Sequence, residues 1–403
     1  MNNKINIFTK VISILLGFFI ICTAMSYTER PLGTTNGKFL IGLIIIGCTI
    51  TNIDFSKYKW IIMLIVVSIL FPLILMVFGI YNFNMLQSLE YILLYLFYLI
   101  LVICLSNVYE NRLGTFIFVW QVSLTLVFLS LLVIYRGLSL NLSYLLKATL
   151  TNQRYGLFLA EQRYGMGFLN VNTLALFAML LVFCSCYSLH KKKYKLFSIF
   201  DLLFAFILIL NAESRTPFVL IIVLAVSLMI VNLKNDIRRY QIQNIILGLE
   251  IIFAFLFAKL FISGDTSSIL YQEMDVFSSY RLSFGTAAIS MLKSNDSLIF
   301  GIGPLNSSYI TEKVFGNVLT LDNSLEYYVF TLGIIGAILI FCYLFYLFYQ
   351  VNISLSKLGF ITATFYFSYS FFENTIFLPI SAVSLFCLVI IFAIVKRSYD
   401  ERK

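Results

Sequence analysis

The chain of 403 residues is 61% hydrophobic and only 12% charged. A soluble chain of this length would be expected to split into about two or three domains, but no polar stretch here is long enough to build a separate core. The formal net charge of +9 does not indicate nucleic acid binding, because its largest clusters, Lys191–Lys195 and Lys234–Arg239, lie in short segments between apolar runs. The composition therefore predicts one integral membrane domain over residues 1–403.

Apolar windows long enough to cross roughly 30 Å of hydrocarbon, at about 1.5 Å per residue, recur from end to end. The windows at 39–53 and 196–210 are the shortest of them. The pattern predicts an all-α polytopic membrane protein with about 12 transmembrane helices. These helices are expected to begin near Lys10, Phe39, Trp60, Leu86, Thr115, Leu169, Leu196, Pro217, Asn244, Ser324, Leu358 and Leu378.

The distribution of Lys and Arg predicts the orientation, since short loops rich in these residues stay on the cytoplasmic side. With the N-terminus inside, most cations fall in inner segments, whereas the short outer loops hold only Arg30, Lys38 and Arg215. Both termini are therefore predicted to be cytoplasmic. The first apolar run is expected to be an uncleaved helix rather than a signal peptide, because many more spans follow it.

Two long segments, at about 136–167 and 263–322, are predicted to lie outside the membrane. The second is long enough to roof a cavity. In the first, leucines at helical spacing predict an amphipathic helix along the outer leaflet. These leucines are Leu142, Leu145, Leu146 and Leu150.

Cysteine and histidine usage excludes several kinds of chemistry. All seven cysteines fall inside predicted spans, so no disulfide framework is expected outside. The single histidine, His190, directly precedes a lysine cluster and is expected to be a solvated loop residue. An intramembrane zinc protease with paired histidines, or a Ser-His-Asp hydrolase facing outward, would need histidines that this sequence lacks.

Four arginines, Arg154, Arg163, Arg215 and Arg281, lie in segments predicted to be outside. Glycines and an Asn-x-Asn pair follow Arg163, and a Gly-x-Gly motif follows Arg281 by about twenty residues. The motifs read, in chain order, Arg163-Tyr-Gly165-Met-Gly167-Phe-Leu-Asn170-Val-Asn172, Asn211-Ala-Glu213-Ser214-Arg215, Gly301-Ile-Gly303, Asp322-Asn323-Ser-Leu-Glu326 and Gly333-Ile-Ile-Gly336.

In these motifs the chain resembles the O-antigen polymerase and ligase superfamily, specifically the Wzy-type polysaccharide polymerases. The resemblance covers roughly residues 150–340. The related ligases usually carry a histidine where this chain has Asp322, so a histidine-based mechanism is not transferred. The fold that the resemblance implies is a GT-C-like membrane glycosyltransferase.

The resemblance also implies an activity, a location and partners. The expected enzyme passes a growing glycan from undecaprenyl diphosphate to a hydroxyl of a lipid-linked repeat unit, at the outer leaflet of a bacterial cytoplasmic membrane. Its partners would be the lipid-linked oligosaccharide and polymer, membrane lipid, a chain-length regulator and a flippase, and no cofactor is expected. The implied catalytic residues are Arg215, Arg281, Asp322 and Glu326, and the implied substrate-binding residues are Arg154, Arg163, Asn170, Asn172, Glu213 and Asn323.

The chemistry of these residues agrees with that activity. Guanidinium groups are always charged and donate in pairs to phosphate oxygens, so they suit a diphosphate leaving group that gains negative charge. The acceptor hydroxyl needs a base, for which Asp322 and Glu326 are candidates one helical turn apart. A metal-dependent transferase would need carboxylates that converge on the cation. Only Glu273 and Asp275 lie close together in an outer loop, and no turn motif makes them converge, which favours a metal-independent mechanism.

Structural roles compete with each catalytic one. Arg154 could be a solvated residue of an interfacial helix, and Arg163 could snorkel at a helix end. Arg215 could pair with Glu213 within a tight hairpin. Asn323 and Glu326 have the spacing of a capping box. The glycines Gly301, Gly303, Gly333 and Gly336 are expected to supply turns and close helix packing.

A second class of function also fits the sequence. Carboxylates within predicted spans, at Glu90, Asp201, Glu250 and Glu373, are typical of groups that line transport pathways or pair with each other. The alternative is thus a lipid-linked oligosaccharide flippase or another secondary transporter. Transporters usually contain two related halves, which this sequence does not display. A non-catalytic scaffold would leave the outer arginines unexplained.

Overall fold

The computed structural model describes residues 2–31, 33–79, 85–141, 164–263, 266–277, 281–304, 321, 323–373, 376–378 and 380–400. Within these residues the regular structure is helical, and the only β pairing is one isolated antiparallel bridge between Thr28 and Phe168. Ten of the described helices are long and apolar enough to cross a membrane. The prediction of an all-helical architecture with many membrane-length helices is confirmed.

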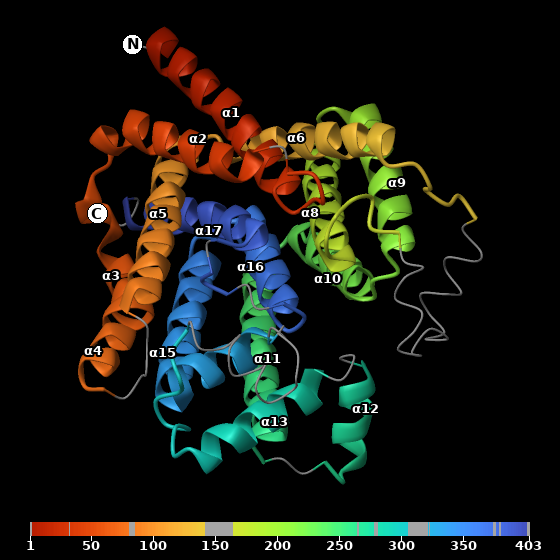
Figure 1. The fold of residues 1–403 in the computed structure, drawn as a ribbon. Helices are drawn as coiled ribbons and strands as arrows, with labels where there is room; N and C mark the ends of the chain where they lie inside the picture. Colours follow the sequence, from red (N-terminus) through yellow and green to blue (C-terminus); the bar gives the residue numbers. More distant parts are fainter. Residues whose placement is uncertain are drawn as a thin grey trace. The chain divides into compact units, whose positions relative to one another are not determined.

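The chain divides into two compact units, of which unit 1 comprises Met1–Ile53 and Ile103–Ala225. In this unit α1 packs against α2 and α6, α6 packs against α8, and α8 packs against α9 (Figure 1). Its elements are α1 (Asn2–Met25), α2 (Thr34–Thr49), η1 (Ile50–Asn52), α6 (Leu113–Ile134), α8 (Val171–His190), α9 (Lys195–Ala212) and the first part of α10 (Thr216–Val231).

Unit 2 comprises Asp54–Val102 and Val226–Lys403. Its longest helix, α15 (Ser324–Ile353), contacts α11, α13, α16, α17 and the α3–η3 segment. The other elements are η2 (Phe55–Ile61), α3 (Ile62–Ile65), η3 (Val66–Leu70), α4 (Phe71–Val77), α11 (Asp236–Ser263), α12 (Ile269–Phe277), α13 (Arg281–Ser294), α16 (Lys357–Ser370) and α17 (Ala382–Asp400). Helix α5 (Met85–Tyr109) continues from unit 2 into unit 1. Membrane-length helices occur in both units.

The positions of the predicted spans agree with the observed helices, but their lengths differ. The windows expected to be shortest, 39–53 and 196–210, correspond to helices that reach membrane-spanning length. Two other predicted spans correspond to shorter helices instead, namely α10 with 16 residues and α16 with 14. Helix α16 ends before Phe371, and Phe371 and Phe372 lie in a turn, so hydropathy alone overestimated its length.

Helix α11 has the surface expected of a helix in lipid. Ile245, Leu249, Ile252 and Leu256 follow helical spacing along one stripe, and between 52 and 61% of each residue is exposed. Its other side buries Leu247, Ala254, Phe257 and Phe261. A stripe of this kind would be an aggregation surface in water, and it is the normal surface of a membrane helix.

A buried polar cluster joins α6, α8 and α9 within unit 1. The Asp201 carboxylate accepts hydrogen bonds from Gln121 Nε2 at 2.7 Å and from Thr125 Oγ1 at 2.9 Å. Gln121 Nε2 also approaches Ser198 Oγ at 3.2 Å, and Gln121 Oε1 accepts from Ser188 Oγ at 2.7 Å. Because every side chain in this cluster is buried, these bonds replace the hydration that the carboxylate loses.

Candidate functional site

The ten candidate site residues fall into three groups. Arg154, Arg163 and Asp322 lie outside the described residues, as does the amphipathic helix expected around Leu142–Leu150. Asn170, Asn172, Glu213 and Arg215 belong to unit 1, whereas Arg281, Asn323 and Glu326 belong to unit 2.

In unit 1, the glycines after position 163 form a tight turn pinned between two helix ends. The Glu29 N–H donates to the Gly167 carbonyl at 2.8 Å, and the Tyr164 hydroxyl donates to the Tyr135 carbonyl at 2.6 Å. Gly167 has φ +80°, and a Cβ there would lie 2.2 Å from the Tyr135 ring. Burial raises the pKa of the Tyr164 hydroxyl, so it stays protonated as a donor. The glycines thus serve close packing.

The Asn-x-Asn pair begins α8. Asn170 is the N-cap residue, and its side-chain oxygen accepts from the Asn172 N–H at 2.8 Å. This bond satisfies one of the helix-end donors that would otherwise lack a partner. Asn170 is exposed and Asn172 is partly exposed, so both side chains are accessible. Their predicted substrate contacts stay a prediction, while the capping role is observed.

Arg215 lies in the hairpin between α9 and α10. Its carbonyl accepts from the Phe218 N–H at 3.0 Å, so Arg215 holds the position before the first turn of α10. Glu213 ends α9 in the left-handed region with φ 51°. This conformation is uncommon for a residue other than glycine and is often found at functional sites. The buried Asn211 fixes the hairpin by bonding to the Ser139 N–H at 2.8 Å and its carbonyl at 3.0 Å.

In unit 2, the short helix α12 fixes the start of α13. The buried Asp275 accepts from both the N–H and the hydroxyl of Ser283, and the N–H bond is 2.8 Å long. The Tyr271 hydroxyl bonds to Thr286 Oγ1 at 2.8 Å. Asp275 thus caps the N-terminal turn of α13, where Arg281 is the first residue. Both carboxylate oxygens of Asp275 are therefore used in this structural role.

The Arg281 guanidinium lies beside Glu373. Arg281 Nη2 is 3.8 Å from Glu373 Oε1, and the two side chains are 14% and 23% exposed. Glu373 follows the end of α16, where its N–H donates to the Tyr369 carbonyl at 3.1 Å. By its sequence context Glu373 is a carboxylate within a predicted span, and no sequence motif connects it with Arg281. Only the packing of α13, α15 and α16 brings the two together.

Glu326 lies against the second turn of α13. A Cβ built on Gly285 would lie 2.5 Å from Glu326 Cδ, so the carboxyl group occupies the space that any larger residue would need. Gly285 is four residues after Arg281 and shares its helix face. Glu326 is only 2% exposed. The structure therefore brings Arg281, Glu326 and Glu373 to the same end of unit 2.

Asn323 and Ser324 tie the start of α15 to the chain after α16. Asn323 Oδ1 accepts from the N–H groups of Leu325 and Glu326, at 2.8 and 3.2 Å, and Nδ2 donates to the Phe371 carbonyl at 3.0 Å. Ser324 Oγ donates to the Glu373 carbonyl at 2.9 Å. Since Asn323 is fully buried and both ends of its amide are bonded, the geometry favours capping over its predicted substrate contact.

The remaining glycine motifs build a break in α15. At Gly333 the backbone has φ 70° and ψ −177°, and the Ile334 N–H donates to the Leu298 carbonyl at 3.1 Å instead of to the preceding helical turn. In return the Phe330 and Thr331 carbonyls accept from the N–H groups of residues 302 and 303, at 3.1 and 2.8 Å. A Cβ on Gly333 would lie 2.1 Å from the Ile299 carbonyl oxygen. Glycine allows this backbone-to-backbone contact.

Comparison of the chain with protein families, with curated proteins and with solved structures finds no match.

Proposed function

We propose that this protein is a membrane glycosyltransferase of the polysaccharide polymerase type. It transfers a growing glycan from undecaprenyl diphosphate to a hydroxyl of a lipid-linked repeat unit at the outer membrane surface. The observation that carries the proposal is the cluster of Arg281, Glu373 and Glu326 around the first turns of α13. The cluster combines a guanidinium, a group suited to bind an anion, with two carboxylates, and Arg281 itself lies in the 263–322 segment that the sequence predicts to be outside.

In the proposed reaction, the bond between the anomeric carbon and the diphosphate oxygen breaks, and the diphosphate keeps the electron pair. The anomeric carbon forms a new bond to the acceptor hydroxyl oxygen, and the hydroxyl proton passes to a carboxylate. Arg281 stabilises the charge that develops on the diphosphate. In this reaction the guanidinium would turn from Glu373, 3.8 Å away in the structure, toward phosphate oxygens.

Three carboxylates are candidates for the proton acceptor. Asp322 and Glu326 come from the sequence analysis, and the structure adds Glu373. Glu373 is the more accessible of the two described carboxylates, because Glu326 is nearly fully buried against α13. We therefore favour Glu373 as the base and assign to Glu326 a positioning role at the start of α15.

Arg281→Ala tests the role of the guanidinium. We expect a protein that still inserts in the membrane but forms polymer about 100-fold more slowly or worse, because one preorganised donor is worth roughly 3 kcal/mol in measured enzymes. Arg281→Lys should recover part of the rate, since it keeps the charge and loses paired donation. Arg215→Ala tests the unit 1 arginine in the same way. Polymer length and amount are measured by gel electrophoresis.

Lys293→Ala is the matched control. Lys293 lies in the last turn of the same helix and donates to the Ile262 carbonyl at 2.8 Å, away from the cluster. It should leave polymer formation unchanged. Normal polymer in both arginine-to-alanine variants would contradict the proposal.

One observation favours the transporter alternative. The break in α15 at Gly333 resembles the discontinuous helices that build substrate sites in secondary transporters. A flippase would move the lipid-linked repeat unit across the membrane without extending it. The two functions differ in where this unit accumulates when the protein is missing.

A further inference from the structure

The short helix α12 begins with two large apolar side chains that the described part of unit 2 leaves uncovered. Ile269 is 74% exposed and Leu270 is 59% exposed. They form the start of α12, within the 263–322 segment that the sequence predicts to be outside the membrane. Removing these side chains from water would be favourable, in proportion to the apolar area that water contacts. Ile269 and Leu270 are called the apolar tip of α12 below.

Hydrogen bonds to α13 fix the direction in which this tip points. The Tyr271 hydroxyl bonds to Thr286 Oγ1 at 2.8 Å, and Asp275 Oδ1 accepts from the Ser283 N–H at 2.8 Å. Going forward along α12 therefore means going backward along α13, so the two helices are antiparallel. The start of α12 lies beside the later half of α13, and the apolar tip points toward the last turn of α13.

That last turn lies at the end of the membrane-length helix α11. Lys293 Nζ donates to the Ile262 carbonyl at 2.8 Å, one residue before α11 ends. The final turns of α11 still expose apolar side chains, with Phe255 72% and Leu256 52% exposed. Residues 264–268 connect α11 to the apolar tip, and at about 3.5 Å per residue this connection spans at most roughly 20 Å. The tip thus lies close to the point where α11 leaves the membrane.

We propose that the apolar tip of α12 inserts into the outer leaflet of the membrane. Its side chains would continue the lipid-facing surface of α11 and gain the free energy of leaving water. Glu273 lies one turn after Ile269 on the same side of α12 and is exposed. A carboxylate is costly to place in hydrocarbon, so only the tip enters, and the rest of α12 lies among the lipid headgroups.

The insertion also gives Arg281 its depth, a consequence that rests on the proposed function, whereas the lipid contact does not. The diphosphate of a prenyl lipid lies at the headgroup level, because its prenyl chain stays in the hydrocarbon. Helix α13 has 14 residues and is about 20 Å long, with Lys293 near one end and Arg281 at the other. A tip held in the leaflet keeps α13 along the membrane surface, so Arg281 stays at the depth of the diphosphate.

The test measures tryptophan fluorescence of the full chain in lipid nanodiscs with two quenchers. Bromine on the lipid acyl chains reports contact with hydrocarbon, and iodide reports contact with water. Ile269→Trp should lose fluorescence with brominated lipid and be protected from iodide. Gln272→Trp is the matched control, because position 272 is equally exposed but lies beyond the tip and faces away from Leu270. It should respond mainly to iodide. The wild type supplies the signal of its two native tryptophans.

A double variant, Ile269→Ser with Leu270→Ser, tests the consequence for Arg281. Both side chains are exposed, so thermal unfolding in detergent should be unchanged, while the amount of polymer formed in membranes should fall. Quenching of Ile269→Trp by iodide, or by neither quencher, would overturn the insertion and leave the proposed function standing. Normal polymer in the double variant would overturn the role in depth. A wild type that forms no polymer would overturn the proposed function, and the quenching result would still decide the lipid contact.

Discussion

Arg281 occupies a position where a cation destabilises its own helix. It is the first residue of α13, and the positive end of a helix dipole disfavours a cation by roughly 0.3–1 kcal/mol. Lys293 lies at the other end of α13, where a positive charge is favourable. Glu373 offsets part of the cost at 3.8 Å, but a neutral residue at position 281 would incur none. Helix stability therefore does not explain Arg281, which agrees with its proposed role in binding an anion.

Because Gly285 has no side chain, the Glu326 carboxyl can occupy the space beside it. A small substitution at Gly285 therefore tests this contact. Gly285→Ala gains up to about 1 kcal/mol of helix propensity, but its Cβ would lie 2.5 Å from Glu326 Cδ. Overpacking of this kind typically costs about 1–3 kcal/mol. We expect a lower unfolding temperature together with reduced polymer formation, because Glu326 must move away from the cluster. Thermal unfolding in detergent and polymer gels measure the two effects.

The matched control is Gly248→Ala in α11, where a Cβ meets no atom within 4 Å. This variant should be as stable as the wild type or slightly more stable, and equally active. If Gly285→Ala and Gly248→Ala had the same unfolding temperature and polymer formation, the close contact between Gly285 and Glu326 would not matter for function.

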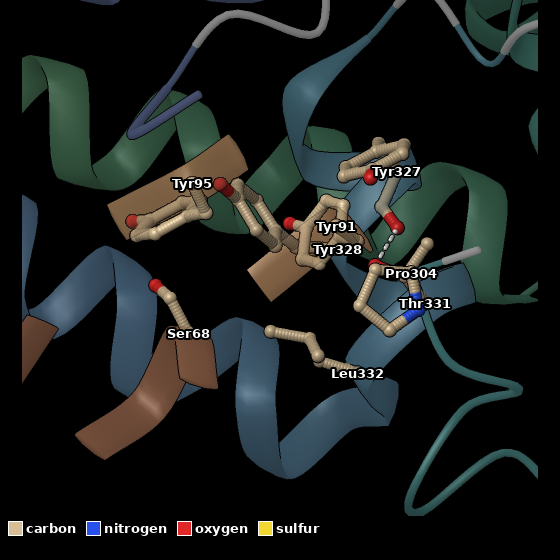
Figure 2. A pocket seen from close by; sticks show the side chains of 8 residues that line it. All are labelled: Ser68, Tyr91, Tyr95, Pro304, Tyr327, Tyr328, Thr331 and Leu332. Carbon is tan, nitrogen blue, oxygen red and sulfur yellow. Dashed lines mark hydrogen bonds between the residues drawn. The ribbon is translucent and has the colours of Figure 1, made fainter. Parts of the chain in front are cut away.

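At the scale of elements, α15 is the helix whose irregularity organises unit 2. Its break exchanges hydrogen bonds between helical turns for bonds to the 298–303 segment, which give new partners to the Phe330 and Thr331 carbonyls and to the Ile334 N–H. This exchange places Pro304 beside Thr331 (Figure 2). The Gly-x-Gly and Gly-x-x-Gly motifs therefore determine the backbone geometry at this break.

Gly333→Ala should disrupt this exchange. The conformation at Gly333, with φ 70° and ψ −177°, is nearly restricted to glycine, and strain of this kind costs about 1–3 kcal/mol before the contact with Ile299 is counted. We expect a loss of stability of about 2 kcal/mol or more and faster amide exchange at residues 302 and 303, measured by hydrogen–deuterium exchange. Gly114→Ala, where a Cβ meets nothing within 4 Å, should show neither effect. Unchanged exchange at 302 and 303 would mean that the pairing does not depend on Gly333.

The helices could be predicted from the sequence, while the site could be predicted only in part. Lipid burial imposes long apolar runs, so the helix positions follow from hydropathy. The motifs indicated Arg281 and Glu326, but the meeting of Arg281 with Glu373 depends on helix packing across 92 positions of sequence. The break at Gly333 depends on backbone pairing with a segment about thirty residues earlier. Neither relation leaves a local pattern in the sequence.

At the scale of the whole molecule, the intramembrane carboxylate Asp201 bears on the choice between enzyme and transporter. Both of its oxygens accept hydrogen bonds from neighbouring side chains, at 2.7 and 2.9 Å, within a fully buried cluster. This arrangement suits a fixed link between helices, which a membrane enzyme needs as much as a transporter does. The cluster therefore does not favour transport, and the location of the stalled substrate has to decide.

Deletion of the protein should leave single lipid-linked repeat units on the outer leaflet if it is a polymerase, because the units are still carried across and are not consumed there. A flippase deletion should leave them on the inner leaflet. Labelling of the sugars with a membrane-impermeant oxidant, before and after permeabilisation, measures the outer fraction. Arg281→Ala should reproduce the deletion with the protein still present, since it removes catalysis and not insertion. Units that become labelled only after permeabilisation would exclude the polymerase and support the transporter.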